Sequence, residues 1–232
     1  NPDIIIRNGT VIDGTGAAAV RADVAVSNDR ITAVGDLGAM SASTDIDAQD
    51  QVVAPGFIDV HTHDDNAVLR DPAMAAKISQ GVTTVVVGNC GISLAPITDI
   101  DPPPPLNLLG GREYFQFATM AAYLAAVTDT RPSVNVAALV GHSTLRAGAM
   151  DDLKRGATGD EIAAMREKLA ASLDAGAIGL SAGLYYKTAA AADMEMWKQK
   201  GTLLLADIKE VGGAAAGGGE GGGGEGGGEG GG

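Results

Sequence analysis

Two histidines and one cysteine are the residues of this chain best suited to hold a metal ion. His61 and His63 follow an apolar run, Phe57 to Val60, so on a β-strand both imidazoles would project to the same side. Cys90, the only cysteine, follows a second strand-like run from Thr83 to Gly88. Imidazole and thiolate ligands together favour zinc over magnesium or calcium. The alternatives are an incidental histidine pair and a small buried cysteine without a ligand role.

The elements that must position these residues alternate from Phe57 onward between strand-like runs and helical patterns. This alternation is typical of parallel βα units. We expect strands that end at His63, Val87, Val140 and Ser181, and helices over 72–80 and 113–127. Catalytic groups of parallel barrels gather at the carboxyl ends of the strands. The positions of the two histidines and Cys90 therefore favour chemistry over packing.

A third helix is predicted where Thr158-Gly159-Asp160-Glu161 matches a capping box. One apolar face follows at helical spacing, formed by Ile162, Met165, Leu169 and Leu173. Lys168 falls on the opposite, solvated side, and Gly176 is expected to end the helix.

The first 54 residues read as short strands broken by turns. The pair Asn8-Gly9 predicts a hairpin, and further strands are expected at 22–26, 30–34 and 52–53. This segment is interpreted as a small β-domain.

Composition limits the class of protein. The formal net charge of −13 and pI of about 4.5 argue against nucleic acid as a partner, because phosphates require a basic surface. No apolar run reaches the roughly 18 residues of a membrane span. The start of the chain lacks the basic and apolar regions of a signal peptide, and a thiolate ligand favours a reducing compartment. We therefore expect a cytoplasmic protein.

Three stretches of the sequence resemble one known family. The stretch from Ala54 to His63 resembles the first barrel strand of the amidohydrolase superfamily, metal-dependent hydrolases built on a (β/α)8 barrel. A cysteine in the Gly-Asn-Cys-Gly setting of residues 88–91 resembles the D-aminoacylase branch, the N-acyl-D-amino-acid deacylases. In that branch a cysteine replaces the carboxylated lysine of most relatives. The segment from Gly141 to Arg146 resembles the Gly-His-x-x-Leu-Arg segment of the same branch.

The resemblance implies an α/β fold, a TIM barrel with a small β-sandwich domain beside it. It implies a zinc ion held by His61, His63 and Cys90. His142 would bind substrate or steady the metal centre, with a structural, hydrogen-bonded histidine as the alternative. Tyr186 would line the substrate pocket or serve only packing, and Ala182 stands where the family segment leads us to expect threonine.

The resemblance covers residues 3–188 and represents only the first half of such a barrel. A complete barrel needs about 250 residues, and residues 57–211 leave room for four or five βα units. The family's general-base aspartate and its further metal-binding histidines are not found, since all three histidines precede residue 150. The expected organisation is a sandwich segment over 1–54, a partial barrel over 55–211, and a Gly/Glu tract over 212–232. That tract would be a tag or residues of unassigned identity.

The function implied is zinc-dependent hydrolysis of the amide bond of a small N-acyl-D-amino acid, giving a D-amino acid and a carboxylate. One alternative is another amide or cyclic-amide hydrolase of the superfamily, similar to dihydroorotase. The other is a catalytically inactive fragment or binding module that keeps the scaffold.

Overall fold

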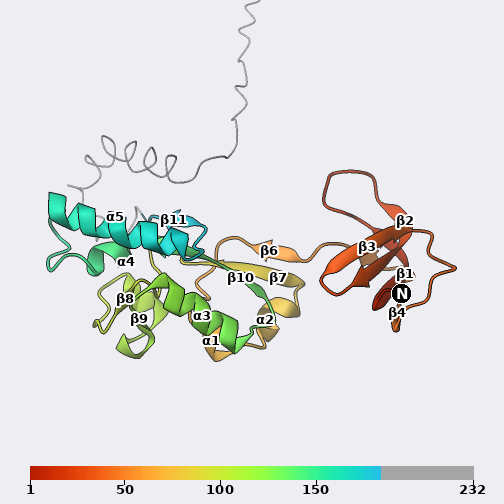
Figure 1. Cartoon of the computed structure of the whole chain (residues 1–232), viewed down its shortest axis with the longest axis horizontal. Helices are drawn as coiled ribbons and strands as arrows, with labels where there is room; N and C mark the ends of the chain where they lie inside the picture. The colour runs from red at the N-terminus through yellow and green to blue at the C-terminus, as the bar shows by residue number, and fades with distance from the viewer. Residues whose placement is uncertain (184–232) are drawn as a thin grey trace, which may run out of the picture.

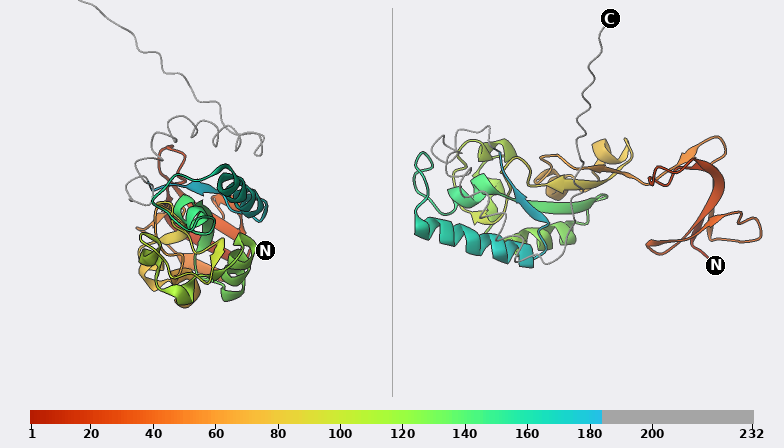
Figure 2. Two further views of the ribbon diagram at one scale, coloured as in Figure 1. Left: turned by 90° about the vertical axis from the view of Figure 1, so that its left-hand side faces the viewer. Right: turned by 90° about the horizontal axis from the view of Figure 1, so that it is seen from above.

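The computed structural model describes residues 1–183, which contain two main β-sheets placed one after the other along an elongated molecule (Figure 1) and a small two-stranded sheet. No helix is formed in the segment of the first main sheet, whereas helices pack around the second. The right-hand view of Figure 2 shows the chain passing from one sheet to the other through a single connection. No helix within residues 1–183 is long and apolar enough to cross a membrane.

The first sheet has five strands in a single layer. Its path is β3-β2-β1-β4, and β5 pairs with β1 in parallel. The strands are β1 (Ile4–Val11), β2 (Val20–Ser27), β3 (Arg30–Gly35), β4 (Thr44–Asp47) and β5 (Val52–Val53). Large apolar side chains on this sheet remain exposed, among them Ile31, Val34 and Val52. The described residues thus supply one layer, and the opposing layer of a sandwich is not among them.

The prediction of a hairpin at Asn8-Gly9 is wrong. β1 continues through this pair with a bulge, where its register against β2 shifts between Ile6 and Gly9. Asn8 has a φ of 61°, its backbone N–H donates to Asp23 Oδ1 over 2.9 Å, and its side-chain amide donates to Asp47 Oδ1 over 3.1 Å. These carboxylates satisfy the polar groups that a bulge leaves unpaired, so the chain bends without reversing.

The second sheet is parallel throughout and follows the chain order β6-β7-β10-β11. Its strands are β6 (Phe57–Asp59), β7 (Val82–Val87), β10 (Asn135–Gly141) and β11 (Gly179–Ser181). Each strand pairs with the next in sequence, as in one half of a barrel sheet. Phe57 and Ile58 at one outer strand and Ile178 just before the other are each at least 60% exposed. Both edges are therefore open within the described residues.

The helices differ from the predicted ranges. The helix expected over 72–80 is reduced to α2 (Ala75–Ile78), because Met74 before it takes a left-handed backbone with φ 45°. The helix α1 (Ala67–Arg70) was not expected. The helix expected from residue 113 is α3 (Met120–Thr130), which begins late because the Thr119 hydroxyl caps it by accepting from Ala122 N.

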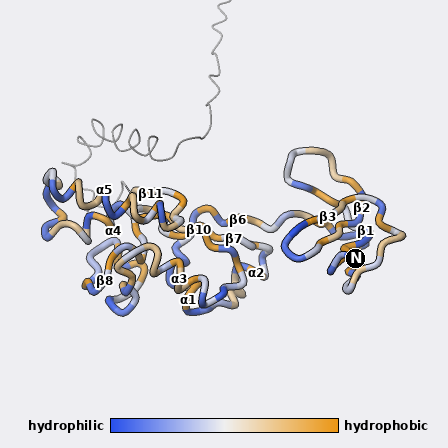
Figure 3. Tube along the Cα trace, viewed as in Figure 1, coloured by the Kyte–Doolittle hydropathy of each residue, from blue (hydrophilic) through white to orange (hydrophobic). Residues whose placement is uncertain are grey.

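The segment between β7 and α3 is a packed substructure. It contains β8 (Ile97–Thr98), two 3₁₀ turns η1 (Leu106–Leu109) and η2 (Arg112–Tyr114), and β9 (Gln116–Phe117), which pairs with β8. The largest side chains that it buries are Ile92, Leu94, Leu106 and Phe115, each at most 1% exposed. They join the core of the second sheet, and Figure 3 shows hydrophobic stretches along β7 and β10.

Two helices lie between β10 and β11 in sequence: α4 (His142–Ala147) and α5 (Gly159–Asp174). The capping box of α5 is confirmed, since Thr158 N donates to Glu161 Oε2 over 2.8 Å and Glu161 N donates to Thr158 Oγ1 over 3.3 Å. Lys168 is not fully solvated as expected. It is half-buried, and its ammonium donates to the carbonyl of Gly148 over 3.1 Å.

Replacing Thr158 with alanine should lower the free energy of unfolding by about 1 kcal/mol, because one of the first-turn amides of α5 loses its acceptor. Urea unfolding of the full-length protein measures this. Thr128→Ala on α3 is the matched control, since that hydroxyl only donates to the carbonyl of Leu124 within its own helix. It should change the free energy by less than about 0.5 kcal/mol. Equal losses from both variants would contradict a capping role.

Candidate metal centre

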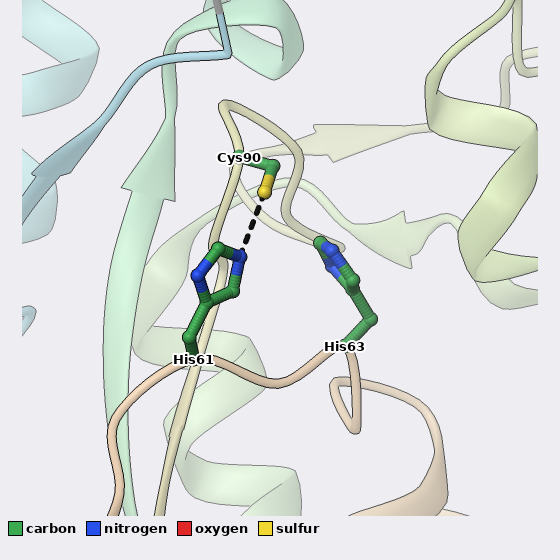
Figure 4. A group of neighbouring side chains, drawn as sticks. All are labelled: His61, His63 and Cys90. Carbon is green, nitrogen blue, oxygen red and sulfur yellow. Dashed lines mark hydrogen bonds between the residues drawn. The ribbon is translucent and has the colours of Figure 1, made fainter.

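The structure brings His61, His63 and Cys90 together (Figure 4). One ligand atom from each residue lies within 4.8 Å of the others. His61 Nε2 is 2.9 Å from Cys90 Sγ. The two imidazole rings stand edge to face, with centroids 5.9 Å apart. Residues separated by 29 positions in sequence thus offer two nitrogens and one sulfur to a single point.

The two histidines lie on the loop after β6, whose strand ends at Asp59, and not on the strand itself as expected. Thr62 between them is buried, while both histidines are exposed. The side chains therefore still alternate, with Thr62 turned into the protein and both imidazoles turned outward. The amide of Asn89 donates to the carbonyl of Thr62 over 3.4 Å. This bond links the histidine loop to the turn that carries Cys90.

Cys90 sits in a tight left-handed turn at the carboxyl end of β7. Its φ is 55°, and the φ values of Gly88 and Gly91 are 78° and 77°. A side chain at Gly88 would place its Cβ 2.1 Å from the carbonyl oxygen of Leu139 on β10. Only glycine fits this close approach of two backbones. The glycines of the Gly-Asn-Cys-Gly pattern are thus a requirement of the turn.

Ser181, at the end of β11, hydrogen-bonds to the backbone of this turn. Its hydroxyl donates to the carbonyl of Gly88 and accepts from the backbone N–H of Gly91 over 3.0 Å. Both groups belong to residues that flank Cys90, and both bonds are buried. A single hydroxyl therefore satisfies one acceptor and one donor of a backbone conformation that a cysteine rarely adopts.

The buried carboxyl of Asp65 lies next to the same turn. Burial raises its pKa to about 7, while a hydrogen bond from the backbone amide of Gly88 acts in the opposite direction. The backbone carbonyl of Asp65 accepts from the Tyr123 hydroxyl over 2.8 Å. Asp65 thus ties the histidine loop both to the Cys90 turn and to α3.

The chain shows similarity to known proteins over most of its length. The amidohydrolase family model matches residues 45–230. The chain belongs to the amidohydrolase family. Over 193 residues it is 53% identical to D-aminoacylase from Alcaligenes xylosoxydans xylosoxydans, covering 83% of this chain and 40% of that protein. N-acyl-D-glutamate deacylase from the same organism is 47% identical over 197 residues, covering 82% of this chain and 39% of that protein.

Solved structures of two amidohydrolases agree with the fold. A D-aminoacylase structure matches with a TM-score of 0.79 and 56% identity, covering 82% of this chain and 40% of that one. The second structure is N-acyl-D-glutamate deacylase from Bordetella bronchiseptica, solved with zinc and a phosphonate mimic of the tetrahedral intermediate. It matches with a TM-score of 0.77 and 49% identity, covering 84% of this chain and 41% of that one. The chain thus spans about two fifths of the length of these amidohydrolases, and its four-stranded parallel sheet has the strand order of half a barrel sheet.

The three donors of this amidohydrolase chain fit a zinc ion. Imidazole nitrogen and thiolate sulfur are the ligands zinc prefers, and three protein ligands leave a position for water or substrate. Metal-binding histidines must be neutral. Partial desolvation of this largely exposed ring, followed by repulsion from His61, lowers the pKa of His63, while the carboxylate of Asp64 acts in the opposite direction. The neutral, ligating form of His63 is therefore favoured at neutral pH.

Of the predicted substrate residues, only His142 lies within the described chain, and Tyr186 lies outside it. His142 follows β10 and begins α4, at the same carboxyl edge of the sheet as Cys90. Burial, with a smaller contribution from the cationic Arg146, lowers its pKa to about 4. The imidazole is therefore neutral at physiological pH, with one nitrogen able to donate and the other to accept. His142 is not part of the three-donor group.

Sequence reasoning missed Ser181, Asp65 and Lys77 as residues that support the site. Ser181 is expected only as the end of a strand and Lys77 only as part of the helix over 72–80, and Asp65 lies outside every predicted element. The position of Asp65 two residues after His63 is a local signal that could have indicated it. No local signal indicated Ser181 or Lys77, because their partners lie 90 and 18 residues away.

Because the folded pKa of His142 is about 4 and its ordinary value is 6.5, the unfolded chain binds more protons between these pH values. The stability contributed by neutral His142 should thus be fully present above pH 6.5 and be lost as the pH falls toward 4, by about 3 kcal/mol at most. His142→Gln in the full-length protein should remove this part of the pH dependence. Urea unfolding at several pH values tests it. Parallel stability curves for the two proteins would contradict a half-buried His142 that stays neutral in the folded protein.

Proposed function

We propose that this chain forms the metal-binding first half of a zinc-dependent deacylase, which hydrolyses the amide bond of N-acyl-D-amino acids to a D-amino acid and a carboxylate. The observation that carries the proposal is the convergence of His61, His63 and Cys90 within 4.8 Å. The relatives support it, because those at 47% to 53% identity are D-aminoacylase and the deacylases of N-acyl-D-aspartate and N-acyl-D-glutamate.

In the proposed enzyme His61, His63 and Cys90 hold the zinc, which when bound supplies Lewis-acid polarisation of the amide carbonyl and lowers the pKa of a coordinated water. The left-handed turn at Cys90 aims the thiolate at the two imidazoles. Neutral His142, at the same edge of the sheet, is placed to hydrogen-bond substrate. Tyr186 is proposed as a wall of the substrate pocket. The general-base aspartate expected of the family is not among the residues of this chain.

The proposed organisation of the whole protein follows from the open edges of both sheets. Further strands would continue the parallel sheet from β11 and close it against β6 as a (β/α)8 barrel. Residues 1–54 would form one layer of a β-sandwich, whose other layer covers the exposed apolar side chains of β1 to β5. The thiolate ligand favours a reducing compartment such as the cytoplasm. The acidic net charge disfavours nucleic acid as a partner.

Cys90→Ala should lower the zinc content of the full-length enzyme, because the sulfur ligand is lost while the small side chain still fits the turn. Metal analysis of the purified protein after dialysis measures this. Ser133→Ala, a serine outside the three-donor group, provides the comparison and should leave zinc content unchanged. An unaltered zinc stoichiometry in the Cys90 variant would remove Cys90 from the ligand set.

The full-length enzyme should cleave N-acetyl-D-methionine much faster than N-acetyl-L-methionine, and removal of zinc with a chelator should abolish the reaction. A comparison of kcat/KM on the two enantiomers measures the preference. Equal rates on both enantiomers, or activity only on cyclic amides, would assign the protein to another branch of the family. Zinc binding without turnover of any amide would indicate an inactive scaffold.

A further inference from the structure

We propose that Lys77 is a positioning residue that holds the loop between β6 and α1 in the shape that brings His61 and His63 together. The inference rests on the proposed function, since it assigns a role to Lys77 only if these histidines bind metal. It concerns a side chain that does not touch the three donors themselves.

The ammonium of Lys77 lies close to three side chains of this loop. Lys77 Nζ is 2.6 Å from Asp59 Oδ2 and 3.0 Å from Asp64 Oδ2, and it donates to Thr62 Oγ1 over 3.3 Å. Asp59 precedes His61 by two residues, Thr62 separates the histidines, and Asp64 follows His63. One cation thus contacts the loop before, between and after its two imidazoles.

These contacts reach the backbone of a metal-binding residue. Asp59, which binds Lys77 through one carboxylate oxygen, accepts from the backbone N–H of His61 with the other, over 3.3 Å. The side chains of Lys77, Asp59 and Asp64 are 23%, 28% and 21% exposed. This partial burial makes the attraction between their charges stronger than in a fully solvated pair.

Lys77 is itself held in place by the second sheet. It belongs to α2, and three residues after this helix ends, the carbonyl of Gly81 accepts from the N–H of Phe57 at the start of β6 over 2.8 Å. The loop it contacts has no regular structure between Asp59 and Ala67. Without the ammonium, Asp59 and Asp64 would face each other unneutralised and the loop would lose its shared anchor. The two imidazoles would then have to be ordered by the metal, which weakens binding.

The test compares zinc affinity with stability in the full-length protein. Zinc dissociation constants are measured by competition with a chromophoric chelator, and thermal unfolding is followed on the metal-free proteins. Lys77→Met should raise the zinc Kd by about 10- to 100-fold, the usual effect of removing a residue that orients metal ligands. Lys77→Arg, which keeps the charge, should recover part of the lost affinity.

Lys168→Met is the matched control, since Lys168 is also half-buried and also donates a hydrogen bond from its ammonium. It should leave the zinc Kd within about threefold while lowering the unfolding temperature. If Lys77→Met does not fold, Lys77→Gln, which keeps a polar group without the charge, replaces it and should also raise the Kd. An unchanged Kd in a folded Lys77 variant of a zinc-binding protein overturns the role of Lys77.

The two proposals fail in different ways. A wild-type protein that binds zinc but does not hydrolyse N-acyl-D-amino acids overturns the proposed activity, while a raised Kd in Lys77→Met still supports the positioning role. A wild-type protein that binds no zinc overturns both. Full hydrolytic activity with an unchanged Kd in Lys77→Met overturns the positioning role alone.

Discussion

The close approach of three parallel strands at their carboxyl ends is the constraint on which the rest of this structure depends. At Gly88 the backbone of the turn after β7 comes so near the carbonyl of Leu139 on β10 that no side chain fits. Ser181 on β11 then hydrogen-bonds to the backbone on both sides of Cys90. A bulkier turn would push β10 away and turn the thiol from the histidine loop. The close packing of β7 against β10 and the direction of the Cys90 thiol therefore depend on the same turn.

The candidate site combines two parts that are held in different ways, the buried turn at Cys90 and the more exposed loop of the two histidines. The Cys90 turn lies among buried backbone hydrogen bonds and the apolar core around Val87 and Ile92. The histidine loop, in contrast, has exposed imidazoles and is ordered by partly exposed charges around Lys77. Buried hydrogen bonds exchange little with water, whereas partly exposed ion pairs are screened by salt. The histidine loop is thus the part of the site whose shape depends more strongly on salt concentration.

Both sheets carry apolar surface that a protein normally covers. Phe57 and Ile58 on β6 and Ile31 and Val34 on β3 are more than half exposed. An open parallel edge with apolar side chains favours association, because unpaired backbone groups and apolar area both gain from a partner strand. The matched amidohydrolases are about two and a half times as long as the region they share with this chain and so have residues available to cover such surfaces.

The sequence by itself determined the three candidate metal donors, the four parallel strands and the cap of α5, because short local patterns in the chain mark each of them. Buried parallel strands read as continuous apolar runs, and the capping box spans four residues. Only the tertiary structure decided the bulge at Asn8, the late start of α3 and the anchoring roles of Ser181 and Lys77. Asn8 bends β1 because Asp23 and Asp47 come from other strands. Ser181 reaches a turn 90 residues earlier. Such contacts leave no local pattern, since they exist only once the sheet has brought distant segments to one edge.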